Sequence, residues 1–177
     1  MAWSFELYFD AKSAGLVRTV SDPHLYRDLG EGTEPAWPHV TLGVTETINE
    51  SAVRELLPRW ATEENSVAVK FEHWGFFFSN SAVLFLSPAQ RDELGLLQRR
   101  FFQTFEQLVA DYWDYYLPDH WVPHCIAWEG LSCEQLARAS RHVSQLSIPL
   151  MARLDRLALV EFGPGRHERL RANLGAL

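Results

Sequence analysis

Apolar and polar residues alternate along several short stretches of this chain, and this alternation predicts β-strands. Residues 3–9 (WSFELYF) alternate strictly between apolar and polar side chains, which is typical of a half-buried strand. Short apolar or β-branched runs bounded by Pro, Gly or polar residues predict further strands. These runs cover residues 37–44, 67–71, 82–86, 121–128 and 148–162.

Between these runs, apolar residues recur at helical spacing. One helix is expected from about Ala11, and another after Asn49, which suits the residue that caps a helix. Residues 87–90 (SPAQ) match a capping box with Pro in the first turn, so a long helix is predicted from there to Tyr112. Residues 132–135 (SCEQ) match a second capping box and predict the last helix.

The resulting order of elements mixes strands and helices at irregular intervals. A uniform parallel βαβ series would need a regular alternation, so the pattern indicates an α+β fold with mainly antiparallel sheets. No linker, low-complexity tract or run of like charges divides the sequence. We therefore expect residues 1–177 to form a single domain.

Composition narrows the function classes. The chain is 47% hydrophobic and 22% charged, as in ordinary globular proteins. Its net charge of −7 argues against a protein that coats long nucleic acid, although a small phosphate ligand needs only a few donors. No apolar stretch is long enough to span a membrane, and the N-terminus does not resemble a signal peptide. We expect a cytoplasmic protein with no membrane partner, in which Cys125 and Cys133 are free thiols.

One short motif occurs twice. Residues 37–42 (WPHVTL) and 122–127 (VPHCIA) both place Pro-His at the start of a short apolar run. A single match of this kind arises easily by chance, so the information lies in the matched pair. Because residues two apart in a strand point to the same face, each copy offers one imidazole, His39 or His124, to a common surface. The side chains expected on that surface beside the imidazoles are Trp37 and Thr41 in the first copy and Ile126 and Trp128 in the second.

The paired motifs resemble those of the 2H phosphoesterase superfamily, often labelled 2′-5′ RNA ligase-like, which is named for two His-x-Thr/Ser motifs. The resemblance covers nearly the whole chain, through WPHVTLG, VLFLSPA, WVPHCIAW and LDRLALVEFGP, and is closest to the small bacterial members. It implies a bilobal fold of two interleaved, pseudo-symmetric lobes. Their two antiparallel sheets would form a concave cleft, with the helices on the outside.

The resemblance also implies an activity. Members act without metal or other cofactor on 2′,3′-cyclic phosphates or 2′,5′-phosphodiesters, by hydrolysis or ligation. Carried over to this sequence, His39 and His124 are the acid–base pair, and Thr41 binds the phosphoryl oxygens. The expected partner is a nucleotide or an RNA terminus carrying such a phosphate. Trp37, Ile126 and Trp128 are expected at the substrate, although the two tryptophans fit a rim or core position equally well.

Ile126 departs from the family pattern, because the second motif of the family has Thr or Ser there. A hydrogen bond to a charged group is worth roughly 1.5–3 kcal/mol, so its loss corresponds to about 10- to 150-fold in rate. A weak enzyme is compatible with this change. So is a module of the same fold that binds a nucleotide or another phosphorylated ligand without turnover.

Other interpretations remain open at the level of sequence. Either histidine alone fits an ordinary, partly buried side chain. His120, His124 and Asp119 are a weak candidate for a metal-ligand set. The spacing of the two histidines suits one face of a helix, but Pro118 and Pro123 oppose a helix there. Residues 76–78 (FFF) fit core and edge packing better than a base-binding cage. An adaptor that uses exposed aromatic residues is the third function class, and a large apolar patch away from the histidines would favour it.

Overall fold

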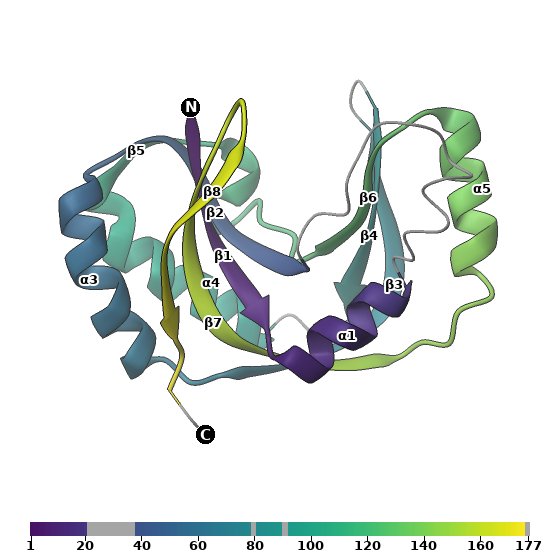
Figure 1. The fold of residues 1–177 in the computed structure, drawn as a ribbon, viewed down its shortest axis with the longest axis horizontal. Coiled ribbons are helices and arrows are strands. Elements are labelled where there is room, and N and C mark those ends of the chain that lie inside the picture. Colours follow the sequence, from purple (N-terminus) through teal and green to yellow (C-terminus); the bar gives the residue numbers. More distant parts are fainter. Residues whose placement is uncertain (21–37, 79–80, 90–91, 176–177) are drawn as a thin grey trace.

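The computed structural model describes residues 1–20, 38–78, 81–89 and 92–175, which form one curved antiparallel sheet flanked by helices (Figure 1). The strand order is β5-β2-β1-β7-β3-β4-β6, and β8 also pairs with β7. The strands are β1 (Ala2–Phe9), β2 (His39–Ile48), β3 (Val67–Phe78), β4 (Ala82–Pro88), β5 (Val109–Tyr112), β6 (Cys125–Leu131), β7 (Leu150–Phe162) and β8 (Arg166–Asn173). The helices are α1 (Ala11–Val20), α3 (Glu50–Glu63), α4 (Asp92–Phe105) and α5 (Cys133–Val143), with short 3₁₀ helices η1 (Glu106–Leu108) and η2 (Asp114–Tyr116).

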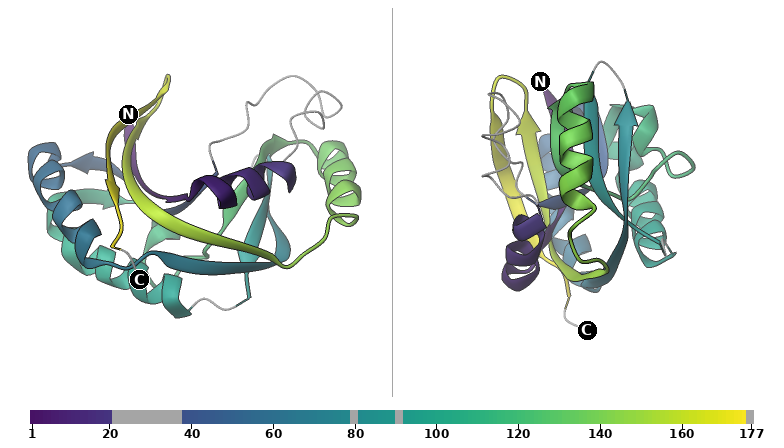
Figure 2. Two further views of the ribbon diagram at one scale, coloured as in Figure 1. Left: turned by 60° about the horizontal axis from the view of Figure 1, so that its bottom comes forward. Right: turned by 90° about the vertical axis from the view of Figure 1, so that its right-hand side faces the viewer.

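Two long strands, β3 and β7, connect the two lobes of the molecule (Figures 1 and 2). Residues 150–154 of β7 pair with residues 67–71 of β3, whereas the later residues of β7 pair with β1 and β8. The first lobe contains β5, β2, β1, β8 and the end of β7, and the second contains the end of β3, β4 and β6. The predicted bilobal α+β fold with antiparallel pairing is confirmed, and the two expected sheets are the two ends of one continuous sheet.

Helices cover the outer sides of both lobes. In the first lobe, Phe5 of β1 packs against Phe101 and Phe105 of α4 at ring-centroid distances of 4.8 and 5.5 Å. The opposite face of β1, here called the inner face, carries Ser4, Glu6 and Tyr8. Every residue of β1 from Ser4 onward is buried, so this part of the strand is buried on both faces rather than on one. A central strand between β2 and β7, with side chains of β8 reaching over it, has no solvent face.

Two helix boundaries differ from the prediction. Ser87 does not cap a helix, because β4 continues through it and its Oγ donates to the carbonyl of Pro123 over 3.1 Å. Helix α4 begins at Asp92 and ends at Phe105 rather than at Tyr112. The chain beyond it pairs with the edge of β2 as strand β5, with Asp111 in a left-handed conformation at φ 58°.

The predicted caps of two other helices are confirmed. The side chain of Asn49 accepts the backbone N–H of Ala52 at the start of α3, and both bonds of the capping box between Ser132 and Gln135 are formed at the start of α5. None of the helices described here combines the length and the apolar character of a transmembrane span.

Candidate active site

His39 is the first residue of β2 and lies on the inner face of the first lobe. It pairs with Tyr8 of β1, and Thr41 pairs with Glu6, so these four side chains share one face of the sheet. The rings of Tyr8 and His39 meet edge to face at 6.5 Å. The strand alternation expected from the sequence therefore places His39 and Thr41 as predicted.

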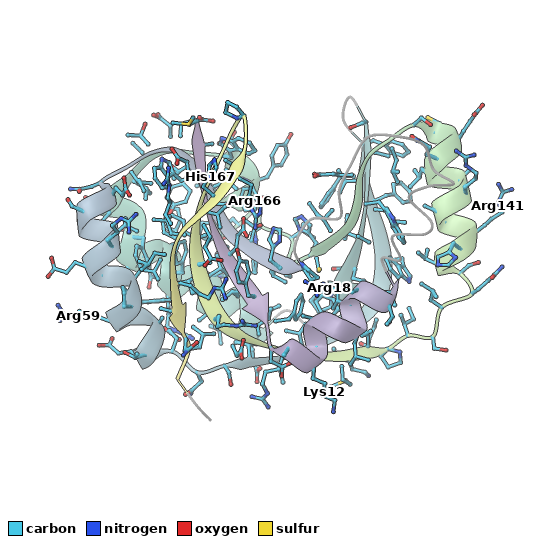
Figure 3. The ribbon with its side chains drawn as sticks, in the orientation of Figure 1. Lys12, Arg18, Arg59, Arg141, Arg166 and His167 are labelled. Carbon is cyan, nitrogen blue, oxygen red and sulfur yellow. The ribbon has the colours of Figure 1, made fainter. Side chains whose placement is uncertain are left out.

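Glu6 lies beneath His39 and is almost completely buried, with 1% of its surface exposed. Its carboxylate accepts hydrogen bonds from the Ser4 hydroxyl at 2.5 Å and from both terminal nitrogens of Arg166, at 2.7 Å for Nη1. The Nε2 atom of His39 lies 3.9 Å from Glu6 Oε1. Figure 3 labels Arg166 among the side chains of the first lobe, on β8.

These contacts keep Glu6 ionised. Burial alone raises the pKa of this carboxyl, but the charge on His39 and the hydrogen bonds and charge of Arg166 outweigh burial, so the pKa of Glu6 is lowered. The distance of 3.9 Å between Glu6 and His39 exceeds a hydrogen bond. The carboxylate therefore acts on His39 through its charge.

His124 immediately precedes β6 and lies against an aromatic wall of the second lobe. Its ring lies 5.1 Å from that of Phe77 and 5.2 Å from that of Phe85. Its Nδ1 lies 2.6 Å from the carbonyl oxygen of Val122. Because a carbonyl only accepts, Nδ1 carries the hydrogen, and in the neutral ring Nε2 is the acceptor.

Burial is the main reason that the pKa of His124 is lowered. The bond to Val122 opposes this effect, and the charge on His39 adds to it. The aromatic wall thus favours a neutral imidazole at this position.

The two histidines meet where the lobes join. Strands β2 and β6 start side by side in the centre of the molecule (Figure 1). The backbone of His39 lies close enough to Cys125 to act on the pKa of its thiol, and the charge on His39 acts on the pKa of His124. The structure therefore brings together the two Pro-His segments that the sequence paired.

Two aromatic residues lie close to Thr41. The indole Nε1 of Trp121 donates to the Thr41 carbonyl at 2.9 Å, and Thr41 is near enough to Tyr116 to act on the pKa of its phenol. Burial, followed by the charge of Glu6 and more weakly that of Glu129, raises the pKa of Tyr116 to about 12. Tyr116 therefore keeps its proton at neutral pH.

The second motif differs from the prediction at Trp128. Leu84 of β4 pairs with Trp128 while the next residue, Phe85, pairs with Ile126, so Ala127 is an extra residue in the strand. This β-bulge reverses the alternation. Trp128 is fully buried beneath α5 and stacks on Trp74 at 6.4 Å, so its assignment to the substrate is wrong.

Ile126 stays on the side of Phe85 and is half-buried. It supplies no hydrogen-bond donor there. Trp37, the other predicted aromatic contact, lies outside the described residues.

The Phe76–Phe78 run is more exposed than core packing requires. Phe76 and Phe78 are 54% and 64% exposed and contact each other, whereas Phe77 points to the other face and stacks on Phe85 at 4.3 Å. Core packing is thus wrong for Phe76 and Phe78, which lie where β3 pairs with β4 alone, at an edge of the sheet.

Cysteine and metal chemistry have little support in this region. Both thiols are unpaired; Cys125 is buried, which raises its pKa, and Cys133 is exposed. His120 Nδ1 lies 3.1 Å from the backbone carbonyl of Asp114. Among the described residues, no three His, Cys, Asp or Glu side chains are arranged to hold a metal ion.

Glu6, Arg166 and Tyr116 belong to the site, and sequence reasoning did not identify them. Glu6 occupies a polar position in an alternating strand, which predicts solvent rather than a buried ion pair. Arg166 follows a glycine turn in a strand of mainly polar residues, and Tyr116 lies in a 3₁₀ turn without a recognisable motif. The one available signal was the concentration of aromatic residues before the second Pro-His segment.

The sequence of this chain matches one known protein family. The sequence model of a family described as the 2'-5' RNA ligase superfamily matches residues 13–166. Among curated proteins, no sequence matches this chain.

Several solved structures share the fold. E. coli LigT in apo form has a TM-score of 0.63 at 15% identity, covering 98% of this chain and 97% of that chain. TT0787 of Thermus thermophilus has a TM-score of 0.61 at 14% identity and 99% coverage of both chains. Usb1 of Kluyveromyces marxianus has a TM-score of 0.52 at 16% identity, covering 94% of this chain and 96% of that chain.

Proposed function

Because this chain belongs to the 2'-5' RNA ligase superfamily, we propose that it is a metal-independent phosphoesterase in which His39 and His124 act as an acid–base pair. Its substrates are nucleotides or RNA ends that carry a 2′,3′-cyclic phosphate or a 2′,5′-phosphodiester. One observation carries the proposal: both Pro-His segments meet at the junction of the lobes. Their histidines have different electrostatic surroundings there, because His39 faces the Glu6 carboxylate and His124 is buried.

His124 is suited to be the base in the hydrolytic direction. Its lowered pKa favours the neutral ring, and the bond from Nδ1 to the Val122 carbonyl leaves the lone pair on Nε2. In the proposed step, Nε2 accepts a proton from a water molecule while the water oxygen forms a bond to phosphorus.

His39 is suited to be the acid. The Glu6 carboxylate lies 3.9 Å from Nε2, so its charge faces the ring that is to hand over a proton. As the bond between phosphorus and the ribose oxygen breaks, His39 gives its proton to that oxygen, so the products are an alcohol and a phosphate monoester. Thr41, two residues along the same face, donates to a phosphoryl oxygen as negative charge develops.

The aromatic wall beside His124 supports a nucleotide as substrate. Phe77 and Ile126 present a partly exposed apolar surface next to His124, with the buried Phe85 stacked behind Phe77, and aromatic faces stack on any base. LigT has been solved in complex with 3'-AMP, which is consistent with a nucleotide site in this fold. With a net charge of −7, small substrates fit better than long RNA. We place the reaction in the cytoplasm, in keeping with the two unpaired cysteines.

Ile126 favours one second candidate, a module that binds a nucleotide or a phosphorylated ligand without turnover. Ile126 lies two positions after His124, where the family has a hydroxyl, and its side chain offers none. Such a module would keep the binding surface and lose transition-state stabilisation.

Turnover of the four common 2′,3′-cyclic nucleotides in the presence of EDTA separates the two candidates. For the enzyme, we expect hydrolysis that persists in EDTA and disappears in the His39→Ala/His124→Ala double variant. Absence of turnover together with a rise in melting temperature on addition of 3'-AMP would establish the binding module. Absence of both would reject the nucleotide as ligand.

A further inference from the structure

A pocket lined mainly by aromatic side chains lies beside the strand that carries His39 and Thr41. It is open to solvent, has a volume of about 790 Å³ and is lined by Tyr112, Trp113, Asp114, Tyr115 and His120. This volume falls within the range of about 300–1,000 Å³ that is usual for small-molecule sites. Its described lining includes no residue of either Pro-His segment, so it is a surface that the proposed mechanism has not used.

Trp113 is anchored to β2, the strand that begins with His39. Its backbone N–H donates to the Val44 carbonyl at 3.0 Å, and its indole Nε1 donates to Glu46 Oε1 at 2.8 Å. Val44 pairs with Ser4 of β1, and paired residues share a face, so Val44 belongs to the inner face of the first lobe. The tryptophan is therefore fixed beside that face without any ligand.

The ring of Trp113 extends over the inner face. It meets Phe162, the last residue of β7, edge to face at 6.0 Å. Phe162 pairs with Arg166, whose side chain donates to Glu6 on the inner face. The indole thus lies on the same face of the sheet as Glu6 and His39.

The pocket and the aromatic wall lie on opposite sides of the two histidines. Thr41 and Val44 are three residues apart in β2, which corresponds to at most about 10 Å along the strand. This distance is comparable to the span of one nucleoside with its phosphate. Phe77 and Ile126 belong instead to the second lobe (Figure 1). A phosphate between the histidines therefore has one aromatic surface in each lobe.

The groups that line the pocket suit a nucleobase better than a phosphate. Trp113 and Tyr115 are 39% and 80% exposed, so both rings are available for stacking. Asp114 contributes a carboxylate, and the described lining contains no lysine or arginine. A carboxylate repels a phosphate, but it accepts hydrogen bonds from the amino group or ring N–H of a base.

Hydrogen bonds within the turn hold the pocket in shape. The N–H of Tyr116 donates to the Trp113 carbonyl at 2.9 Å, which closes the turn around η2 and Tyr115. The Nδ1 of His120 lies 3.1 Å from the Asp114 carbonyl oxygen and ties the returning chain to the same turn. Because these bonds need no ligand, the pocket is preorganised for binding.

We propose that this pocket is a subsite for a second nucleobase, which stacks on Trp113 and Tyr115, and that the preferred substrate is a 2′,5′-linked dinucleotide rather than a single cyclic nucleotide. This inference rests on the proposed function, which includes both kinds of substrate. One nucleoside of the phosphodiester contacts the wall beside His124, the other occupies the pocket, and the phosphate lies between the histidines.

Tyr115→Ala tests the subsite, because it removes one stacking surface from a side chain that is mostly exposed. The substrates compared are 2′,5′-linked adenylyl-adenosine and 2′,3′-cyclic AMP. We expect kcat/KM for the dinucleotide to exceed that for the cyclic nucleotide in the unmodified chain. In Tyr115→Ala, the value for the dinucleotide should fall about 5- to 100-fold, and the value for the cyclic nucleotide should stay unchanged.

Two further variants separate stacking from other effects. Phe78→Ala is the matched control, because it removes a ring that is 64% exposed at the edge of the second lobe, and both activities should persist. Tyr115→Phe keeps the stacking ring and should retain activity on the dinucleotide. The proposal is overturned by an equal loss on both substrates in Tyr115→Ala, by no loss on either, by a preference for the cyclic nucleotide, or by an equal loss in Tyr115→Phe.

Calorimetry distinguishes failure of the subsite from failure of the proposed function. If the unmodified chain hydrolyses neither substrate, the proposed activity fails, and the dinucleotide is then a stable ligand whose affinity reports on the pocket. We expect Tyr115→Ala to bind it about tenfold more weakly than Phe78→Ala does. Equal affinities, or no binding by any variant, would reject the subsite.

Discussion

Glu6 is buried on the inner face of the first lobe, where one guanidinium balances its charge and one imidazole faces it. Ser4 and Arg166 satisfy its oxygens, and His39 lies 3.9 Å away. Such a group is stable as an anion only while these partners remain. From sequence, the strict alternation of β1 predicted a solvent-facing Glu6. The partner that buries it comes from β8, 160 residues further along the chain, and no local pattern reports that contact.

Arg166→Leu should therefore destabilise the fold at pH 7. Removing one partner of a fully buried pair costs about 3–5 kcal/mol, and we expect about 2 kcal/mol here because Arg166 is partly exposed. The lowered pKa of Glu6 means that its ionised form contributes stability above its unfolded pKa, and that this contribution is lost as the pH falls through the folded value. The difference between variant and unmodified chain, measured by urea unfolding, should shrink below about pH 4.

Arg171→Leu is the matched control on the same strand. Arg171 pairs with Glu168 at the surface, so its loss should change the free energy of unfolding by less than about 1 kcal/mol. Equal effects of the two substitutions, or an effect of Arg166→Leu that does not depend on pH, would contradict the role given to Glu6.

The aromatic wall controls the protonation of His124. Phe77 contacts the imidazole edge to face and shields it from water, and burial is the main cause of its lowered pKa. Phe77→Ser should let water reach the ring and raise this pKa toward about 6.5. For a base that acts in its neutral form, the acid limb of the kcat/KM profile should then move to higher pH.

Phe78→Ser tests whether this effect is local. Phe78 follows Phe77 in β3 but points to the opposite face, where it contacts Phe76. The acid limb should be unchanged in this variant. Movement of the limb in Phe78→Ser, or none in Phe77→Ser, would show that the wall does not set the protonation of His124.

At the scale of elements, local signals predicted the helices whose caps are formed by adjacent residues. Asn49 and residues 132–135 cap α3 and α5 as expected. The same kind of signal failed at Ser87, because pairing of β4 with β3 extends the strand through the cap position. Capping boxes are local, whereas strand ends are decided by partners distant in sequence.

The alternation of residues along a strand predicted which side chains share a face, except where a β-bulge interrupts β6. In β6, the extra residue Ala127 separates Ile126 from Trp128 and sends the tryptophan under α5. Strand β8 gave no hydrophobic signal because most of its side chains are exposed. These two features explain why Trp128 was misplaced and why Arg166 was missed.

Ser132→Ala should destabilise α5 by about 1 kcal/mol. Ser132 accepts the N–H of Gln135, and the alanine leaves that donor unpaired at the start of the helix. Ser144→Ala, at the other end of α5, removes only an exposed bond to the Arg141 carbonyl and serves as the control. Urea unfolding that ranks the two variants in the reverse order would contradict the capping interpretation.

At the scale of the whole molecule, the site depends on two strands that belong to both lobes. Because β3 and β7 run through the junction, the starts of β2 and β6 are brought together although they lie at different places in the sheet. The sequence identified the two histidines from a repeated motif. It contained no signal for the asymmetry between them, which comes from Glu6 on one side and the Phe77–Phe85 wall on the other.

The proposed mechanism requires His39 and His124 to act as one unit. The most direct test is the kcat/KM for the best 2′,3′-cyclic nucleotide, measured for His39→Ala, His124→Ala and the double variant. Residues that act together in one step are strongly non-additive. Each single variant should lose about 10²–10⁴-fold, and the double variant little more. Retention of activity in either single variant, or losses that multiply in the double variant, would contradict the two-histidine mechanism.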